Sequence, residues 1–409
     1  MNLPSDADAS GRSFDEREKR ELERVLDSGT LNCTRGRTVR EFEEKFASLL
    51  GSRFCRCTTS GTAAIHTALS ALDLRPGDEI LTTPITDMGA ITPILYQGAI
   101  PVFADVDPLT LNVTPETLEA RIGPRTKAIL ATHLFGNPCD MDGILELGRK
   151  HGLPVLEDAA QAFLATWKGK PVGTLGAIGC FSLQQGKHMT TGEGGMVVTD
   201  DPALFRTMKL FVDKAWPYGE PDPDHEFLAL NYRMTELQGA VALGQLEKLE
   251  ANVARRIETA EALTEALEDI EGLSLPRALP GARHVYWRYA LMADERFIPG
   301  GPDDLARMLK ERGIWAAPRY VQKPAFECKV LKERRAFGGS GFPWTGEHRR
   351  NDPEIVYRLE DTPGAVLGLS RVIVLPWNEN LTLDHVRMIA DAIRDCVERL
   401  RSGVRPAAG

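Results

Sequence analysis

One lysine lies between an apolar, strand-like run and a turn rich in glycine. Lys187 follows the Cys-Phe-Ser-Leu run at residues 180–183 and precedes the turn at residues 190–195. Upstream, the Val-Leu-Glu-Asp run at residues 155–158 reads as a strand that ends on an acid, Asp158. An amine and an acid at strand ends suit pyridoxal phosphate (PLP) chemistry. The amine forms a Schiff base with the cofactor aldehyde, and the acid pairs with the pyridinium nitrogen.

Two acids are adjacent at the end of the upstream run, and in a strand their side chains point to opposite faces. Asp158 follows Val-Leu and precedes two alanines, so its carboxylate must be paired if it is buried. A pyridinium N–H would pair with it and stay protonated. Glu157 would point the other way, which makes it the weaker candidate. The alternative role for Asp158 is that of a helix N-cap.

Small and polar residues near these two could hold the rest of the cofactor. Ser60-Gly61-Thr62-Ala63 closes one strand and opens a helix, whose free N–H groups suit a phosphate. An ordinary Ser/Thr cap is the alternative. Gln161 lies about one helical turn after Asp158 and could reach a ring oxygen. Ser182 and Gln184 share one strand face, and Ser182 could add a hydroxyl to the phosphate.

The elements that must position these residues alternate between strand and helix. The expected strands are residues 53–58, 79–83, 101–106, 126–134, 154–157, 179–183 and 196–199, with helices at 63–72 and 141–150 between them. This alternation predicts an α/β fold with a mostly parallel sheet covered by helices on both faces. Ligands in such sheets bind beyond the carboxyl ends of the strands. Asp158 and the stretch from Gln184 to Lys187 fall at such ends.

The second half of the chain indicates a smaller domain. A long helical pattern at residues 237–267 predicts the connection, and the boundary is expected near residue 250. We therefore predict an N-terminal arm and large domain over residues 1–249 and a small α+β domain over residues 250–409. The small domain is expected to hold a strand at 285–292 and helices at 302–312 and 383–400. Residues 323–365 show little periodicity and are interpreted as a long insertion or lid.

Bulk properties exclude several classes of protein. A chain of 409 residues is long enough for two domains. The net charge of −9, without a dense basic stripe, argues against a nucleic-acid partner. No apolar run approaches the roughly 18 residues of a membrane span, and residues 1–12 lack the features of a signal peptide, so we expect a cytoplasmic protein. The seven scattered cysteines predict reduced thiols and no metal site.

Taken together, these motifs resemble the DegT/DnrJ/StrS family of sugar aminotransferases, in the fold-type-I class of PLP enzymes. The resemblance runs from about residue 14 to residue 320 and resumes near residue 370. It implies a large domain built on a seven-stranded sheet. The motifs that carry it are Ser60-Gly61-Thr62, Glu157-Asp158-Ala159-Ala160-Gln161, Phe181-Ser182 through Lys187, Thr191-Gly192-Glu193-Gly194-Gly195 and Asn231-Tyr232-Arg233-Met234-Thr235-Glu236-Leu237-Gln238.

The resemblance implies a role for each matched residue. Lys187 would be the Schiff-base lysine, Asp158 the pyridinium partner and Gln161 a ring contact. Thr62, Ala63 and Ser182 would hold the phosphate, with Gly61 and Gln184 beside them. Asn231 would reach the phosphate of the neighbouring subunit, which implies a homodimer with shared active sites. Positions on the substrate side would be Tyr320, Arg319, His284, Tyr286 and Arg233.

The sequence also departs from the family pattern. An aromatic residue usually stacks on the cofactor ring, but the matching stretch is Thr86-Asp87-Met88-Gly89, so Met88 or nothing stacks there. Gln184 stands where many members have histidine, and this variant is similar to the cyclitol and aminohydroxybenzoate branches. Arg319 replaces a usual histidine. Residues 323–365 match no family segment.

The resemblance implies an aminotransferase that uses PLP, with pyridoxamine phosphate as its intermediate form. It would move an amino group from glutamate or glutamine to a keto-sugar, nucleotide-linked or free, or to a cyclitol ketone. One alternative is a dehydratase or aromatising enzyme of the same fold, although the flanking motifs place Lys187, not His188, at the reactive position. A second alternative is a regulatory protein that binds PLP without turnover, which no DNA-binding motif supports.

Overall fold

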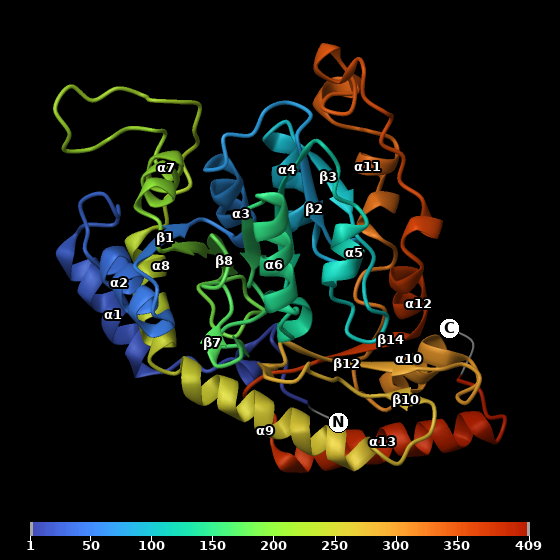
Figure 1. The fold of residues 1–409 in the computed structure, drawn as a ribbon. Coiled ribbons are helices and arrows are strands. Elements are labelled where there is room, and N and C mark those ends of the chain that lie inside the picture. Colours follow the sequence, from blue (N-terminus) through green and yellow to red (C-terminus); the bar gives the residue numbers. More distant parts are fainter. Residues whose placement is uncertain (1–2, 407–409) are drawn as a thin grey trace.

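Seven strands form the central sheet in the first half of the chain (Figure 1). The computed structural model describes residues 3–406. In the order of the sheet the strands are β1 (Phe54–Thr58), β9 (Gly195–Thr199), β8 (Ile178–Ser182), β5 (Val155–Asp158), β4 (Thr126–Thr132), β2 (Glu79–Thr82) and β3 (Ile100–Phe103). Within this sheet only β9 runs antiparallel to its neighbours. The predicted α/β fold with a mostly parallel sheet is therefore confirmed.

Helices cover both faces of this sheet because most of its strands carry apolar side chains on both sides. The helices that precede residue 247 are α1 (Glu16–Ser28), α2 (Thr38–Leu50), α3 (Gly61–Ser70), α4 (Thr92–Tyr96), α5 (Pro115–Glu119), α6 (Met141–His151), α7 (Pro202–Val212) and α8 (Glu236–Leu246). In β2, Leu81 joins the buried cluster that contains Phe42 of α2 and Ile144 of α6. Its neighbour Ile80 joins the opposite cluster with Leu69 of α3. This alternation is what a sheet buried on both faces requires.

The carboxyl ends of the central strands meet at one edge of the sheet. Thr132 at the end of β4 is in register with Asp158 at the end of β5, and Asp158 is in register with Cys180 of β8. Strand β1 runs in the same direction as β8, so Ser60, which follows β1, lies at the same edge. Ligand sites in α/β sheets form beyond such strand ends.

A second sheet belongs to the C-terminal part of the chain. Its strands, in order, are β10 (Leu273–Ser274), β12 (Arg288–Ala293), β14 (Val372–Pro376) and β13 (Ala317–Pro318). The helices of this part are α9 (Leu249–Leu267), α10 (Gly301–Glu311), α11 (Lys329–Lys332), α12 (Pro363–Arg371) and α13 (Leu383–Arg401). Residues of α9, α10 and α13 share one buried cluster with β12 and β14. A third small sheet joins β6 (Thr166–Trp167), β7 (Lys170–Pro171) and β11 (Ala282–Arg283).

The prediction of one continuous helix over residues 237–267 is wrong, because the structure has two helices there. Helix α8 ends at Leu246 and α9 begins at Leu249, so the chain changes direction at Glu247 and Lys248 (Figure 1). Lys248 Nζ bonds Glu18 Oε1 of α1 at 2.6 Å, which anchors the break to the large domain. We propose that the domain boundary predicted at residues 249–250 lies at this break.

The segment predicted as an insertion packs against the edge of the large sheet. Phe326 and Trp344 are buried in one cluster with Phe103 of the edge strand β3. Tyr357 donates a hydrogen bond from its hydroxyl to the Pro101 carbonyl at 2.9 Å. In Figure 1 this part of the chain, in orange, stands beside β3 and α5. Because β3 is an edge strand, these aromatic side chains shield it from pairing with another chain.

The N-terminal segment, defined here as residues 4–13, crosses from the small sheet to the large domain. Asn378 Nδ2 donates to the Pro4 carbonyl at 3.0 Å, and Asn380 Nδ2 donates to the Ser10 carbonyl at 2.8 Å. Helix α1 follows and is opened by an Asp15 capping box. Between residues 3 and 406 no helix is both long and apolar enough to cross a membrane.

Candidate active site

A cavity of about 450 Å³ lies at the edge where the central strands end. The described residues that line it include most of the predicted cofactor positions: Ser60, Gly61, Thr62, Ile65, Thr86, Asp87, Gly89, Ala90, Asp158, Ala160, Gln161, Ser182, Gln184, Lys187, Glu193, Trp287, Arg288 and Tyr320. Residues from both halves of the chain therefore share one site. We refer to it below as the lysine cavity.

The lysine cavity brings together Lys187 and Asp158, the two residues on which the sequence interpretation depends. Burial lowers the pKa of Lys187 to about 8, and the nearby Arg288 charge acts in the same direction against the attraction of Asp158. Lys187 Nζ lies 4.1 Å from the centre of the Trp287 ring. Burial raises the pKa of Asp158, because the charged carboxylate has lost most of its water. A buried amine with a lowered pKa is suited to nucleophilic and proton-transfer chemistry.

The two adjacent acids of β5 have different surroundings. Glu157 is fully buried, and its carboxylate accepts hydrogen bonds from the N–H groups of Gly173, Leu175 and Gly176 at 2.6–2.7 Å. His133 Nε2 lies 3.0 Å from the same carboxylate. Glu157 therefore stabilises the fold and points to the opposite face of the sheet from Asp158, as strand alternation predicts.

Asp158, by contrast, keeps part of its hydrogen-bonding capacity for the cavity. Its Oδ1 accepts from the Ala160 N–H at 3.1 Å, and its Oδ2 lies 3.4 Å from the Thr132 hydroxyl. These contacts hold the carboxylate in place at the end of β5. A carboxylate has roughly four acceptor positions, so capacity remains for a ligand N–H.

Another part of the lining of the lysine cavity is built from small and hydroxyl residues at the start of α3. Ser60 caps this helix by accepting from the Ala63 N–H at 3.0 Å. The first N–H groups of a helix have no partner within the helix, so this end suits an anion. A Cβ added to Gly61 would lie 2.8 Å from the Ser182 Cβ. The glycine therefore lets the Ser182 hydroxyl approach the helix end.

Gln161 is fixed between the sheet and the small domain. Its Oε1 accepts from the Phe135 N–H at 2.7 Å, and its Nε2 donates to the Tyr320 hydroxyl at 3.2 Å. Burial raises the pKa of Tyr320, so this hydroxyl stays protonated. Through Gln161, the pair of hydrogen bonds joins Phe135, which follows β4 of the central sheet, to Tyr320, which follows β13 of the second sheet.

Three predicted cofactor positions, Met88, Ala63 and Gln184, have contacts other than those expected of them. Met88 packs toward the cluster that contains Phe326 and is not among the described residues that line the cavity. Ala63 is buried in α3, and its N–H is already bonded to Ser60. Gln184 lies on the lining, but its Oε1 accepts from the Gly186 N–H at 2.8 Å. It thus shapes the turn before the lysine.

The predicted substrate positions divide into two groups. Tyr320 lines the lysine cavity, whereas Arg319 lines a neighbouring hollow and forms a two-pronged ion pair with Asp303 at 2.8 Å. His284 and Tyr286 are buried and stack on each other with ring centres 3.9 Å apart. Burial lowers the pKa of His284 to about 3. Neither ring is among the described residues that line the lysine cavity.

The Asn-Tyr-Arg segment lies away from the lysine cavity of its own chain. Asn231 is exposed and forms an isolated bridge with Asp213. Arg233 forms an ion pair with the same aspartate. Neither is among the described residues that line the cavity.

Sequence reasoning did not identify Trp287 and Arg288, which both line the lysine cavity. Trp287 Nε1 donates to the Gly186 carbonyl at 2.6 Å, and the Arg288 guanidinium carbon lies 4.7 Å from the centre of the Trp287 ring. Tyr286 has a φ of +48°, so the chain is not extended there and side chains do not alternate. Both residues lie in the strand that the sequence predicted at residues 285–292. The adjacent aromatic and cationic side chains in that strand were the signal that could have identified them.

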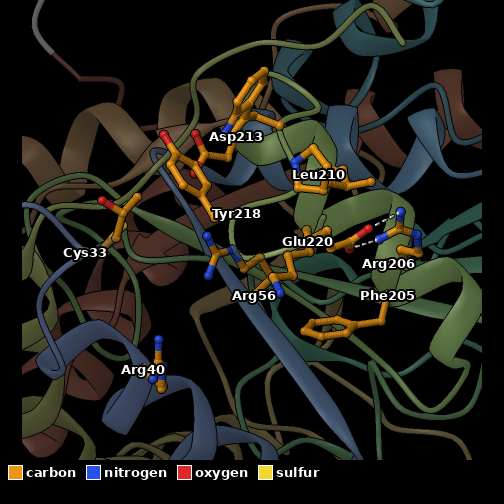
Figure 2. A pocket seen from close by; sticks show the side chains of 13 residues that line it. Cys33, Arg40, Arg56, Phe205, Arg206, Leu210, Asp213, Tyr218 and Glu220 are labelled. Carbon is orange, nitrogen blue, oxygen red and sulfur yellow. Dashed lines mark hydrogen bonds and ion pairs between the residues drawn. The ribbon is translucent and has the colours of Figure 1, made fainter. Parts of the chain in front are cut away.

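A second hollow, of about 310 Å³, lies between α2, β1 and α7 (Figure 2). Figure 2 shows Arg56 inside it and Arg206 directed at Glu220, with an ion-pair distance of 2.6 Å. Its lining contains cations and aromatic rings but no lysine–aspartate pair at strand ends. It does not offer the groups that the predicted chemistry needs.

Comparisons with known proteins agree with the geometry. A model of the DegT/DnrJ/EryC1/StrS aminotransferase family matches residues 12–350. The spore coat polysaccharide biosynthesis protein SpsC of Bacillus subtilis (strain 168) is 34% identical over 396 residues, which cover 93% of this chain and 94% of SpsC. The GDP-perosamine synthase of Caulobacter vibrioides is 38% identical over 290 residues, or 70% of this chain and 76% of that enzyme.

Solved structures are similar over nearly the whole chain. The X-ray structure of an aminotransferase from Psychrobacter cryohalolentis matches with a TM-score of 0.84 at 33% identity. The match covers 95% of this chain and 98% of that one. The family model reaches residue 350, and so extends into the segment at residues 323–365 that was predicted to match no family segment.

Proposed function

This chain belongs to the DegT/DnrJ/EryC1/StrS aminotransferase family, and from that membership we propose that it moves an amino group from glutamate or glutamine to the ketone of a sugar. The chain is an aminotransferase, and its fold is that of the fold-type-I enzymes. PLP is the cofactor of this family. The single observation that carries the proposal is the presence of Lys187 and Asp158 in one cavity, at the strand ends where PLP would bind.

The residues of the lysine cavity fit PLP. One part of the lining offers the α3 helix end with Ser60, Gly61 and Ser182 for a phosphate, and another offers a buried carboxylate, Asp158, for a ring N–H. The approach between helix and strand is close, because a Cβ at Gly61 would overlap Ser182. Lys187 lies on the same lining with a lowered pKa. These features support the assignment of the whole cavity to one phosphorylated pyridine.

The cofactor, when bound, supplies an aldehyde carbon that takes up the amino group and a ring that accepts electrons from the substrate α-carbon. Lys187 Nζ would hold the cofactor covalently until an amino substrate displaces it. The freed Nζ would then move a proton away from the substrate α-carbon. Asp158 would keep a proton on the ring nitrogen, and this positive charge is what makes the ring an electron acceptor.

The nature of the acceptor belongs to the same proposal. GDP-perosamine synthase is a relative at 38% identity, which favours a nucleotide-linked keto-sugar. Gln184 in place of histidine keeps a cyclitol ketone as the second choice. The structure supports a fixed role for Gln184 in the turn, since its Oε1 accepts from the Gly186 N–H. The acceptor would then enter beside Tyr320 and Trp287, on the small-domain side of the cavity.

A homodimer with shared sites is also proposed. The segment before Asn231 exposes large apolar side chains: Leu228 is 95% exposed and Leu230 is 45% exposed. Neighbouring exposed apolar residues are typical of an interface between chains. Asn231 itself is exposed and lies off its own lysine cavity, which favours a contact with the partner's phosphate.

The direct test compares Lys187→Ala with Lys150→Ala, a control at an exposed lysine of α6. Both variants are purified with PLP, and their visible absorbance and keto-acid production from glutamate and glutamine are measured. We expect the visible band and the keto acid to be lost in K187A and kept in K150A. An unchanged band in K187A would refute the assignment. A panel of nucleotide-linked keto-sugars and an inosose then identifies the acceptor.

A further inference from the structure

Arg288 is the second cation of the lysine cavity. Among the described residues that line the cavity, only Lys187 and Arg288 carry a positive charge, while Asp87, Asp158 and Glu193 are acidic. If Lys187 holds the cofactor, as proposed above, Arg288 is the remaining cation of that lining. An anionic substrate group entering the cavity would otherwise meet mainly negative side chains.

The charge partner of Arg288 is a carboxylate from the N-terminal segment. Asp6 Oδ2 lies 2.5 Å from Arg288 Nη1, and Asp6 Oδ1 lies 2.9 Å from Arg12 Nη2. The side chains of Asp6 and Arg288 are 11% and 19% exposed. Gln185 Nε2 also donates to the Asp6 carbonyl at 3.0 Å. The segment thus places one carboxylate oxygen against the guanidinium at the edge of the cavity.

The surroundings of Arg288 keep its guanidinium in the cavity. The group lies 4.7 Å from the centre of the Trp287 ring, and Lys187 Nζ lies 4.1 Å from the same ring. A Cβ added to Gly186 would lie 3.3 Å from Arg288 Nη2, so a glycine leaves room for the guanidinium beside the lysine turn. Trp287 is itself fixed by its hydrogen bond to the Gly186 carbonyl.

We propose that Arg288 is the binding site for the α-carboxylate of the amino donor, and that Asp6 occupies this site when no donor is bound. A guanidinium fork matches a carboxylate, and its present partner is a carboxylate. The donor carboxylate displaces Asp6 Oδ2, while Asp6 keeps its contact with Arg12. The N-terminal segment therefore acts as an internal competitor of the donor. This inference rests on the proposed aminotransferase function.

The position of Arg288 favours the donor over the cofactor phosphate as the anion. The phosphate-binding groups lie at the start of α3, where Ser60 and Ser182 converge. Arg288 and Lys187 instead lie against the same Trp287 ring. In an α-amino acid the carboxylate is attached to the carbon that bears the nitrogen. An amino acid whose nitrogen replaces that of Lys187 therefore carries its carboxylate into the neighbourhood of Arg288.

The test uses the PLP-loaded enzyme and four variants: Arg288→Gln, Arg288→Lys, Asp6→Asn and Asp8→Asn. Asp8 is the matched control, because it belongs to the same segment but is exposed, and the hydrogen bonds of its side chain among the described residues are to Ser10 alone. The first measurement is the loss of visible absorbance on mixing with glutamate or glutamine, without any acceptor. The second is calorimetric binding of glutarate, a dicarboxylate that has no amino group to transfer. Thermal unfolding of each variant checks its folding.

We expect R288Q to raise the half-saturating donor concentration about tenfold or more, with a smaller change in the rate at saturation. Glutarate binding should weaken by a similar factor, and R288K should recover part of both losses. D6N should do the opposite: it should lower the half-saturating donor concentration and tighten glutarate binding several-fold. D8N should behave as the parent enzyme in both measurements.

Two results would overturn the inference while leaving the proposed function intact. The first is an R288Q enzyme that reacts with donor as the parent does, or in which only the acceptor half-reaction changes. The second is a folded D6N enzyme that binds glutarate more weakly than the parent, which would make Asp6 a support and not a competitor. If the parent enzyme reacts with neither donor, it is the proposed function that fails.

Discussion

The two adjacent carboxylates at the end of β5 have different roles. One stabilises the fold, and the other lines the candidate active site. Glu157 accepts three backbone N–H groups on one face, and Asp158 lines the lysine cavity on the other. Strand alternation predicted these opposite directions from the sequence. The hydrogen bonds of Glu157 depend on the turn at residues 173–176, which no local pattern connects with β5.

Substitutions at the two acids should therefore have different effects. Asp158→Asn should lower kcat about 10²- to 10³-fold, because the ring nitrogen of the cofactor loses its charged partner. Glu157→Gln should instead lower the free energy of unfolding by roughly 3 kcal/mol, since its buried backbone donors lose a charged acceptor. Steady-state kinetics and denaturant unfolding measure the two effects. Equal activity losses in folded D158N and E157Q would contradict this division of roles.

The amine of Lys187 should titrate well below an ordinary lysine. Burial lowers its pKa to about 8, so the neutral and reactive form increases as pH rises through about 8 and not through 10.5. The rate at which the apoenzyme captures PLP should therefore reach its plateau above about pH 8. Stopped-flow absorbance over pH 6–10 measures this.

Removal of the Arg288 charge provides the control for this pH profile. The positive charge of Arg288 contributes to the lowered pKa of Lys187, so Arg288→Gln should move the midpoint to higher pH. A midpoint that stays near 10.5 in the parent enzyme would show that the amine is exposed to water before the cofactor binds.

At the scale of elements, the strand-to-helix turn from β1 to α3 depends on one close approach. A Cβ on Gly61 would lie 2.8 Å from Ser182 Cβ and 3.0 Å from its hydroxyl oxygen. The helix end and β8 would have to separate to admit it. The motif at residues 60–63 indicated a phosphate-binding turn. That Ser182 packs against Gly61 could not be read from the sequence and is known only from the structure.

Gly61→Ala should accordingly weaken both folding and cofactor binding. We expect a loss of about 1–3 kcal/mol in the free energy of unfolding and a higher Kd for PLP. Gly123→Ala is the matched control, because a Cβ there makes only an ordinary contact at 3.6 Å with Glu79. Denaturant unfolding and PLP titration measure both quantities. A G61A protein with parental stability and Kd would show that the turn can relax without cost.

The break between α8 and α9 marks a limit of prediction from local pattern. Apolar residues continue at helical spacing across Glu247 and Lys248, so the sequence predicted one helix. The break depends on contacts far away in the chain: Lys248 Nζ bonds Glu18, and Glu247 pairs with Arg17 and Arg20 of α1. Both helices keep an apolar face on the core, so the spacing of apolar residues in the sequence does not change at the bend and cannot reveal it.

The segment at residues 323–365 shows the converse limit. Its low periodicity was read as an insertion or lid, yet Phe326, Trp344 and Tyr357 pack on the edge of the large sheet. Single aromatic anchors spaced along an irregular chain produce no repeating signal. The central strands were predictable because most of them carry apolar side chains on both faces, which a sheet buried on both faces requires.

At the scale of the whole molecule, the exposed apolar residues near Asn231 favour a partner subunit. If Asn231 serves the partner's cavity, two inactive variants should complement each other. Mixing Lys187→Ala with Asn231→Ala and letting the subunits exchange should restore activity, because the mixed dimer holds one site with both residues intact. Activity is measured before and after exchange.

The control for this complementation is Lys187→Ala mixed with Asp158→Asn. Both residues line one cavity of the same chain, so neither site of the mixed dimer is complete and activity should stay low. Failure of K187A and N231A to complement, together with a monomeric mass in solution, would contradict the shared site.

The N-terminal segment has a consequence for how the protein is made. The Pro4 carbonyl bonds Asn378 and the Ser10 carbonyl bonds Asn380, which lie 374 and 370 positions further along the chain. On the ribosome, these bonds cannot form until the chain has been translated past residue 380. Until then the N-terminal segment lacks the contacts that hold Asp6 against Arg288 at the edge of the lysine cavity. A nascent chain would thus acquire the ion pair between Asp6 and Arg288 only after the small sheet and the residues that follow it have been made.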